Sequence, residues 1–165
     1  MVYIIDANNL VGQMGIINQK NFDKILIDII SYKYRIKAEK IFLIFDGIQN
    51  HEERYIFENI NIIYAVYNDL KQAADRKILE IINFQTYKKK DIVLITNDIE
   101  LQEEAKNINS KIKIIRASII AEQIQNILKK EEKTKEVLDE KINHLTKKEI
   151  EEINNDLLCD FLKRS

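Results

Sequence analysis

Short apolar runs alternate with segments of helical spacing along most of this chain. Each apolar run is continuous, as is typical of a strand that is buried on both faces of a parallel sheet. Strands alternating with helices favour an α/β fold in which helices cover both faces of a mainly parallel sheet. The predicted strands are residues 2–5, 41–45, 62–66, 92–95 and 112–115. The predicted helices are residues 22–30, 51–58, 73–84, 99–106 and 118–128.

Length and local composition divide the chain into two parts. At 165 residues it is long enough for one domain of ordinary size, which we place at residues 1–128. Residues 129–165 are charge-rich, and the capping box Thr146-Lys147-Lys148-Glu149 precedes apolar positions at helical spacing. We therefore expect an amphipathic helical extension that packs back on the domain, pairs with a second copy as a homodimer, or docks on a partner.

Composition predicts a cytoplasmic protein without a membrane span. Hydrophobic residues make up 45% and charged residues 32% of the chain, and no apolar run approaches the roughly 20 residues of a membrane helix. A single cysteine, Cys159, cannot form an internal disulfide, which fits a reducing compartment. The net charge of −1 does not by itself indicate a nucleic-acid partner.

Aspartates recur where the predicted strands end. Asp6, Asp46 and Asp98 each follow a predicted strand within three residues, and Asp75 lies at the start of the helix after the third strand. Because the carboxyl ends of parallel strands meet at one edge of a sheet, these four carboxylates are expected to converge. Taken singly, each aspartate is an ordinary turn or cap residue.

Converging carboxylates repel one another unless they take up protons or bind a cation. A hard divalent ion with oxygen ligands, Mg²⁺ or Mn²⁺, resolves this repulsion and suits phosphodiester hydrolysis. We predict Asp6, Asp75 and Asp98 as direct ligands, with Asp46 a ligand itself or acting through a water. The expected supporting residues are Asn9, which contacts phosphate or a ligand carboxylate, Thr96 and Asn97, which orient Asp98, and Arg76 and Lys77, which meet the substrate.

Four ordered segments carry a family resemblance. They are Ile4-Ile5-Asp6-Ala7-Asn8-Asn9, Ile44-Phe45-Asp46-Gly47, Ala73-Ala74-Asp75-Arg76-Lys77-Ile78 and Ile95-Thr96-Asn97-Asp98. The set resembles the motifs of NYN domains, which are PIN-like nucleases, and is closest to the YacP-like branch of bacterial endoribonucleases that act on messages in association with ribosomes. The resemblance runs from about residue 2 to residue 128 and implies an Mg²⁺- or Mn²⁺-dependent endoribonuclease that cuts RNA.

One departure from that branch is Ala7-Asn8, where glycine–tyrosine is common, so an aromatic side chain is missing beside the acids. Tyr64 and Tyr67 are candidates for stacking on bases, against the more common alternative of packing in the core or at its rim.

Other functions stay open. An RNA-binding or ribosome-binding adaptor of the same fold has no need of four carboxylates. A haloacid-dehalogenase-like phosphatase needs a second aspartate two residues after the first, and Asn8 stands there. A nuclease toxin and a DNA substrate remain alternatives within the nuclease class.

Overall fold

The structure is a computed structural model that describes residues 1–34, 36–47, 49–66, 73–84, 87 and 90–143. Its contacts divide the chain into two units, residues 1–127 and 128–165. The predicted tail helix after Thr146, together with Tyr67, lies outside the described residues. In the described part of the chain no helix is long and apolar enough to cross a membrane.

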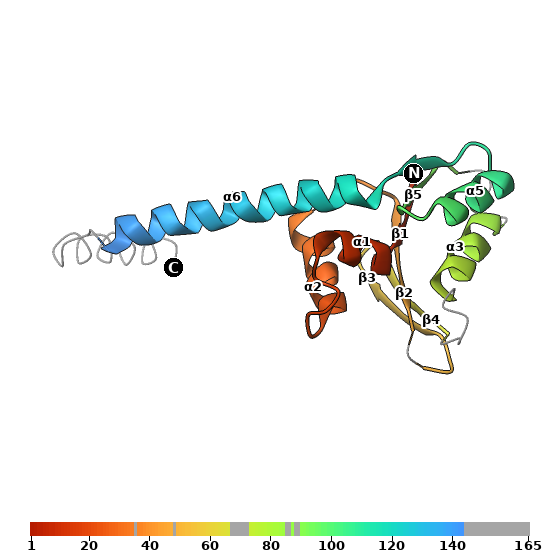
Figure 1. The fold of residues 1–165 in the computed structure, drawn as a ribbon, viewed down its shortest axis with the longest axis horizontal. Helices are drawn as coiled ribbons and strands as arrows, with labels where there is room; N and C mark the ends of the chain where they lie inside the picture. The colour runs from red at the N-terminus through yellow and green to blue at the C-terminus, as the bar shows by residue number, and fades with distance from the viewer. Residues whose placement is uncertain (35, 48, 67–72, 85–86, 88–89, 144–165) are drawn as a thin grey trace, which may run out of the picture. The chain divides into compact units, whose positions relative to one another are not determined.

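A sheet of six strands, counted over the described residues, forms the centre of the first unit (Figure 1). The strands lie in the order β3-β4-β2-β1-β5-β6, and neighbouring strands run parallel except for β3 and β4. The predicted mainly parallel α/β sheet is thereby confirmed. The strand bounds are β1 Val2–Asp6, β2 Lys40–Asp46, β3 Glu53–Phe57, β4 Ile60–Ala65, β5 Ile92–Ile95 and β6 Lys113–Ile115.

Strand β1 lies between β2 and β5, with Ile5 paired to Leu43 on one side and to Ile95 on the other. The chain runs outward from β1 through β2 and β4, then crosses back to β5 on the opposite side. Such a reversal opens a crevice at the carboxyl ends of the strands, where α/β proteins bind ligands.

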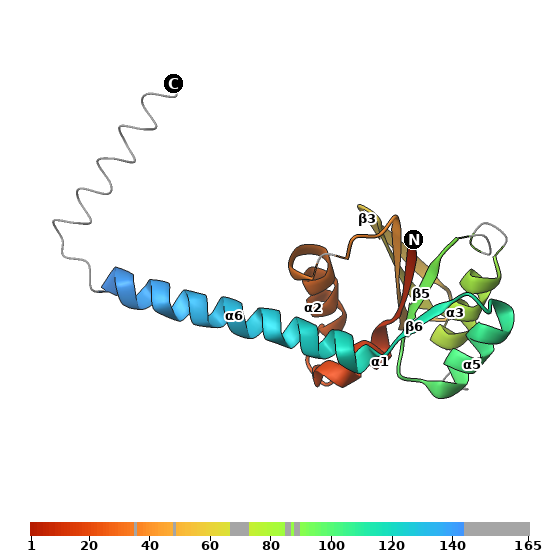
Figure 2. The same ribbon diagram turned by 90° about the horizontal axis from the view of Figure 1, so that it is seen from above.

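Helices cover both faces of the sheet, as predicted. Figure 2 shows α1 and α2 on one side, and α3 and α5 on the other. The side chains of Ile4, Ile44, Ile78 and Leu101 form part of the core between the sheet and the second pair of helices. The helix bounds are α1 Ala7–Met14, α2 Phe22–Asp28 with its π-helical continuation η1 Ile29–Lys33, α3 Ala73–Asn83, α5 Ile99–Ile108 and α6 Ala117–Asn143.

Residues 51–58, predicted as a helix, form no helix, so that prediction was wrong. Glu53–Phe57 is instead strand β3, which pairs antiparallel with β4. The sequence Tyr55-Ile56-Phe57 combines aromatic and β-branched side chains, which favour strands, and the edge of β4 supplies the hydrogen-bonding partners.

The structure also contains a helix that was not predicted, α1. Its signals are visible in the sequence: Asp6 caps the first turn by accepting the N–H of Asn9, and Leu10, Val11 and Met14 are buried along one side. Gly15 ends the helix in the left-handed conformation at φ 74°, which a glycine adopts without strain.

Candidate functional site

The four predicted aspartates come from four elements at the carboxyl edge of the sheet. Asp6 is the last residue of β1 and Asp46 the last residue of β2. Asp98 follows β5 by three residues and caps α5, while Asp75 lies in the first turn of α3. We call these four side chains the acidic edge.

Asp6 is the most buried member of the acidic edge, with 6% of its surface exposed. Its Oδ1 accepts the backbone N–H of Asn9 at 3.0 Å, and its Oδ2 accepts the hydroxyl of Thr96 at 2.9 Å. Burial raises the pKa of Asp6, the two hydrogen bonds oppose that rise, and the charges of Asp46 and Asp98 add to it. The carboxylate is therefore held in one orientation within a negative environment.

Thr96 joins Asp6 to Asp98. Its hydroxyl donates to Asp6 and accepts the backbone N–H of Asp98 at 3.0 Å, and the residue is fully buried. Asp98 Oδ1 in turn accepts the N–H of Leu101 at 2.9 Å, which caps α5. One side chain thus sets the positions of two aspartates that come from separate strands.

Asp46 and Asp75 meet at the start of α3. Asp46 Oδ1 accepts the backbone N–H of Ala74 at 3.1 Å, one residue before Asp75. Burial, followed by the charges of Asp6, Asp98, Asp46 and Glu104, raises the pKa of Asp75 to about 6. Because such effects require proximity, all four predicted aspartates lie in one electrostatic neighbourhood.

Three asparagines connect the loops of the acidic edge. Asn9 Oδ1 accepts the N–H of Asn97 at 3.0 Å, and Asn97 Oδ1 accepts the N–H of Ser118 at 3.3 Å. Asn8, which was not among the predicted site residues, accepts the N–H of Asp46 through its Oδ1 at 3.1 Å. Asn8 and Asn9 therefore link the start of α1 to the end of β2 and to the loop after β5, and the amide oxygen of Asn9 is engaged inside the protein.

The two predicted cations behave differently. Arg76 is exposed and lines a small cavity of about 70 Å³ together with Asp75, Asp98 and Glu104. Lys77 is only 8% exposed, and its Nζ lies 2.8 Å from carboxylate oxygens of both Glu52 and Glu80. The charge of Lys77 is thus neutralised by protein groups, which leaves Arg76 as the member of the pair beside the acidic edge.

Glu104 is a further carboxylate that the sequence reasoning missed. It lies on α5, lines the same small cavity as Asp75 and Asp98, and raises the pKa of Asp75. The sequence feature that could have identified Glu104 is its four-residue spacing from Glu100. Two residues at this spacing lie on one side of a helix, and this helix begins at the acidic edge.

The chemistry of these donors fits a hard divalent cation, since carboxylate oxygens are its preferred protein ligands. Among the described residues, no three histidine, cysteine, aspartate or glutamate side chains are placed so that they could hold one metal ion. Mg²⁺ is commonly held by one or two carboxylates, with waters and substrate phosphates completing its shell. The acidic edge fits that mode and not a closed cage of protein ligands.

Comparisons with known proteins identify the family. The model of the YacP-like NYN domain matches residues 3–159, which extends past the four sequence segments and through most of the tail. The crystal structure of a Rae1 (YacP) variant from Bacillus subtilis is similar in fold, with a TM-score of 0.54, 15% sequence identity and 84% of each chain covered. A search of curated proteins found no match. The chain therefore belongs to the family of YacP-like NYN domains, which is a family of PIN-like nuclease folds and suggests a nuclease of the RNase type.

Proposed function

We propose that this protein is an endoribonuclease that requires Mg²⁺ or Mn²⁺ and cuts messenger RNA on the ribosome. The observation that carries the proposal is the acidic edge, where burial and three neighbouring aspartates together raise the pKa of Asp75 to about 6. Mutual repulsion of this kind is relieved when a cation binds. Membership of a nuclease family supports the same conclusion.

The residues of the acidic edge and Arg76 have separate roles in the proposed reaction. A bound divalent ion lowers the pKa of the attacking water and stabilises charge on the phosphate. Asp75 and Asp98 offer carboxylate oxygens beside the exposed Arg76, whose guanidinium is suited to contact a phosphate. Asp6 remains able to bind the ion, because a carboxylate oxygen that accepts one hydrogen bond keeps a second lone pair.

Cleavage of a labelled single-stranded RNA with Mn²⁺ or Mg²⁺ tests the proposal. Asp6→Asn and Asp98→Asn each remove a charge, yet asparagine still caps a helix, so the folds of α1 and α5 are preserved. We expect each substitution to reduce the cleavage rate at least about 100-fold. Asp91→Asn is the matched control, since Asp91 is an exposed aspartate directly before β5, at the opposite edge of the sheet.

The results separate the nuclease from its alternative. Metal-dependent cutting that Asp6→Asn and Asp98→Asn abolish, and Asp91→Asn leaves intact, supports the nuclease. If free RNA stays intact, translating ribosomes are the next substrate. Intact messages there too would favour an RNA-binding or ribosome-binding adaptor, for which the absence of a three-carboxylate cage among the described residues is the supporting observation.

A further inference from the structure

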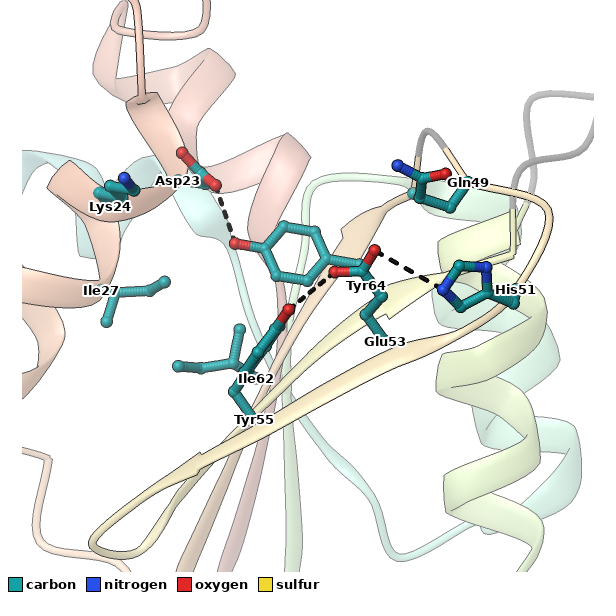
Figure 3. Close-up of a pocket in the computed structure, with 10 residues that line it drawn as sticks. Asp23, Lys24, Ile27, Gln49, His51, Glu53, Tyr55, Ile62 and Tyr64 are labelled. Carbon is teal, nitrogen blue, oxygen red and sulfur yellow. Dashed lines mark hydrogen bonds and ion pairs between the residues drawn. The ribbon is translucent and has the colours of Figure 1, made fainter.

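A second cavity, of about 460 Å³, lies on the α2 face of the sheet (Figure 3). Side chains from α2, β3 and β4 line it, together with residues just after β2. Its volume falls within the range of small-molecule sites. We call it the tyrosine pocket and define it by Asp23, Lys24, Gly47, Glu53, Tyr55 and Tyr64.

Two tyrosine rings form the aromatic part of this pocket. Tyr64 stacks on the buried Phe45, with ring centroids 5.1 Å apart and planes 17° from parallel. Tyr55 meets Tyr64 nearly at a right angle, at 6.1 Å and 84°, and remains 54% exposed. A large ring held in place and open to solvent is the platform on which proteins stack unpaired nucleobases.

Carboxylates orient both tyrosines. The Tyr64 hydroxyl donates to Asp23 Oδ2 at 2.8 Å, and the Tyr55 hydroxyl donates to Glu53 Oε2 at 2.9 Å, as the dashed lines in Figure 3 show. Ionised carboxylates only accept hydrogen bonds, and each keeps lone pairs beyond the one that a tyrosine uses. Two such groups attract a base edge rich in N–H donors, and Nε2 of His51, 3.9 Å from Oε1 of Glu53, is a further polar group in the pocket.

Among the RNA bases, guanine has the edge that matches this chemistry best. Its N1–H and N2 amino group are adjacent donors that a single carboxylate accepts together, whereas uracil offers one N–H. Its O6 is an acceptor, for which Lys24 in the same pocket supplies a donor.

The pocket begins next to the acidic edge. Gly47, which lines the pocket, directly follows Asp46 in the chain. A side-chain carbon at Gly47 would lie 1.8 Å from the backbone oxygen of Ala65, so only glycine allows the ends of β2 and β4 to approach this closely. The tyrosine pocket and the acidic edge therefore share the end of β2: Gly47 lines the pocket, and Asp46 Oδ1 accepts the N–H of Ala74 on the α3 side.

We infer that the tyrosine pocket binds an unpaired guanine of the RNA next to the phosphate that is cut, and so sets the sequence preference. This inference rests on the proposed function for its biological meaning. Its test is a binding measurement without cleavage, so that the two can fail separately.

The experiment measures binding of fluorescent 12-nucleotide RNAs by anisotropy, in the presence of a chelator that prevents cutting. One RNA is all uridine, and the other carries a single central guanosine. We expect the wild-type protein to bind the guanosine RNA at least about fivefold more tightly, in line with the free energy of stacking one base.

Tyr55→Ala and Asp23→Asn each should remove most of this preference. Tyr32→Ala is the matched control and should retain it, because Tyr32 is also exposed, at 59%, and also makes an edge-on contact, here with Phe57. If circular dichroism shows that Tyr55→Ala does not fold, Asp23→Asn alone tests the inference, because its amide oxygen still accepts the hydrogen bond from Tyr64.

Equal binding of both RNAs by the wild type, or no measurable binding of either, overturns the inference. So does a preference that survives both pocket variants, or a loss that affects the two RNAs equally. A guanosine preference in a protein that never cuts RNA would support the guanine-binding inference and contradict the proposed nuclease function. Metal-dependent cutting without any guanosine preference would support the nuclease function and contradict the guanine-binding inference.

Discussion

At the scale of single residues, Thr96 connects two members of the acidic edge. Its buried hydroxyl is both the donor to Asp6 and the acceptor from the N–H of Asp98. Thr96→Val keeps the shape but leaves both partners without this hydrogen bond, so we expect a loss of about 1–3 kcal/mol in the free energy of unfolding. Urea denaturation followed by circular dichroism measures it.

Thr96→Ser keeps the hydroxyl. This variant should therefore retain most of the stability of the wild type and whatever cleavage activity the wild type has. A Thr96→Val protein within about 0.5 kcal/mol of the wild type would contradict the bridging role.

Asp75 should make stability depend on pH. Its pKa is raised from 3.8 to about 6, first by burial and then by the neighbouring aspartates. Between these values the folded protein holds a proton that the unfolded chain releases, so raising the pH from 4 to above 6 favours unfolding. We expect the metal-free protein to lose about 1–2 kcal/mol over this interval, after allowance for solvent screening at this half-buried group.

Denaturant melts at a series of pH values, in a chelator, measure this loss. Asp75→Asn should flatten the decline, and adding Mg²⁺ or Mn²⁺ to the wild type should do the same, because a cation offsets the repulsion. An unchanged slope in Asp75→Asn would show that other groups produce it.

At the scale of elements, the close approach of β2 and β4 at Gly47 should be intolerant of a side chain. Gly47→Ala would place its Cβ 1.8 Å from the backbone oxygen of Ala65, and we expect a loss of about 1–3 kcal/mol in the free energy of unfolding. Gly12 is the matched control: it lies in α1 with nothing within 4 Å of an added Cβ. Gly12→Ala should stabilise the protein by about 0.5–1 kcal/mol, since alanine favours helices.

Thermal unfolding of the two alanine variants provides the comparison. Equal melting temperatures for both would mean that the strands separate at little cost and that the end of β2 is not held rigidly.

At the scale of the whole molecule, the residues of the acidic edge and the core of the sheet all belong to the unit formed by residues 1–127. A chain that ends at Leu128 should therefore fold and cut free RNA at a rate close to that of the full chain. Sedimentation of both forms tests the alternative in which the tail pairs with a second copy, which requires the truncated form to be the smaller assembly. Loss of the folded state on truncation would show that the tail belongs to the domain.

Local pattern in the sequence was enough to predict the parallel strands, most helices and the aspartates at the strand ends. Continuous apolar runs such as Ile41–Phe45 indicate a strand that is buried on both faces. This pattern can be recognised from adjacent residues alone. The same local reasoning failed at β3, whose strand state depends on pairing with β4, and it overlooked the cap that Asp6 provides for α1.

How those residues meet depends on contacts between distant parts of the fold. Thr96 and Asp6 are 90 positions apart, and their hydrogen bond exists because β1 pairs with β5. Lys77 reaches Glu52 across the sheet edge, which turns a predicted substrate contact into an internal ion pair. Periodicity describes which face of an element is buried, whereas strand order and packing determine which distant side chains share that space, and these are properties of the whole folded chain.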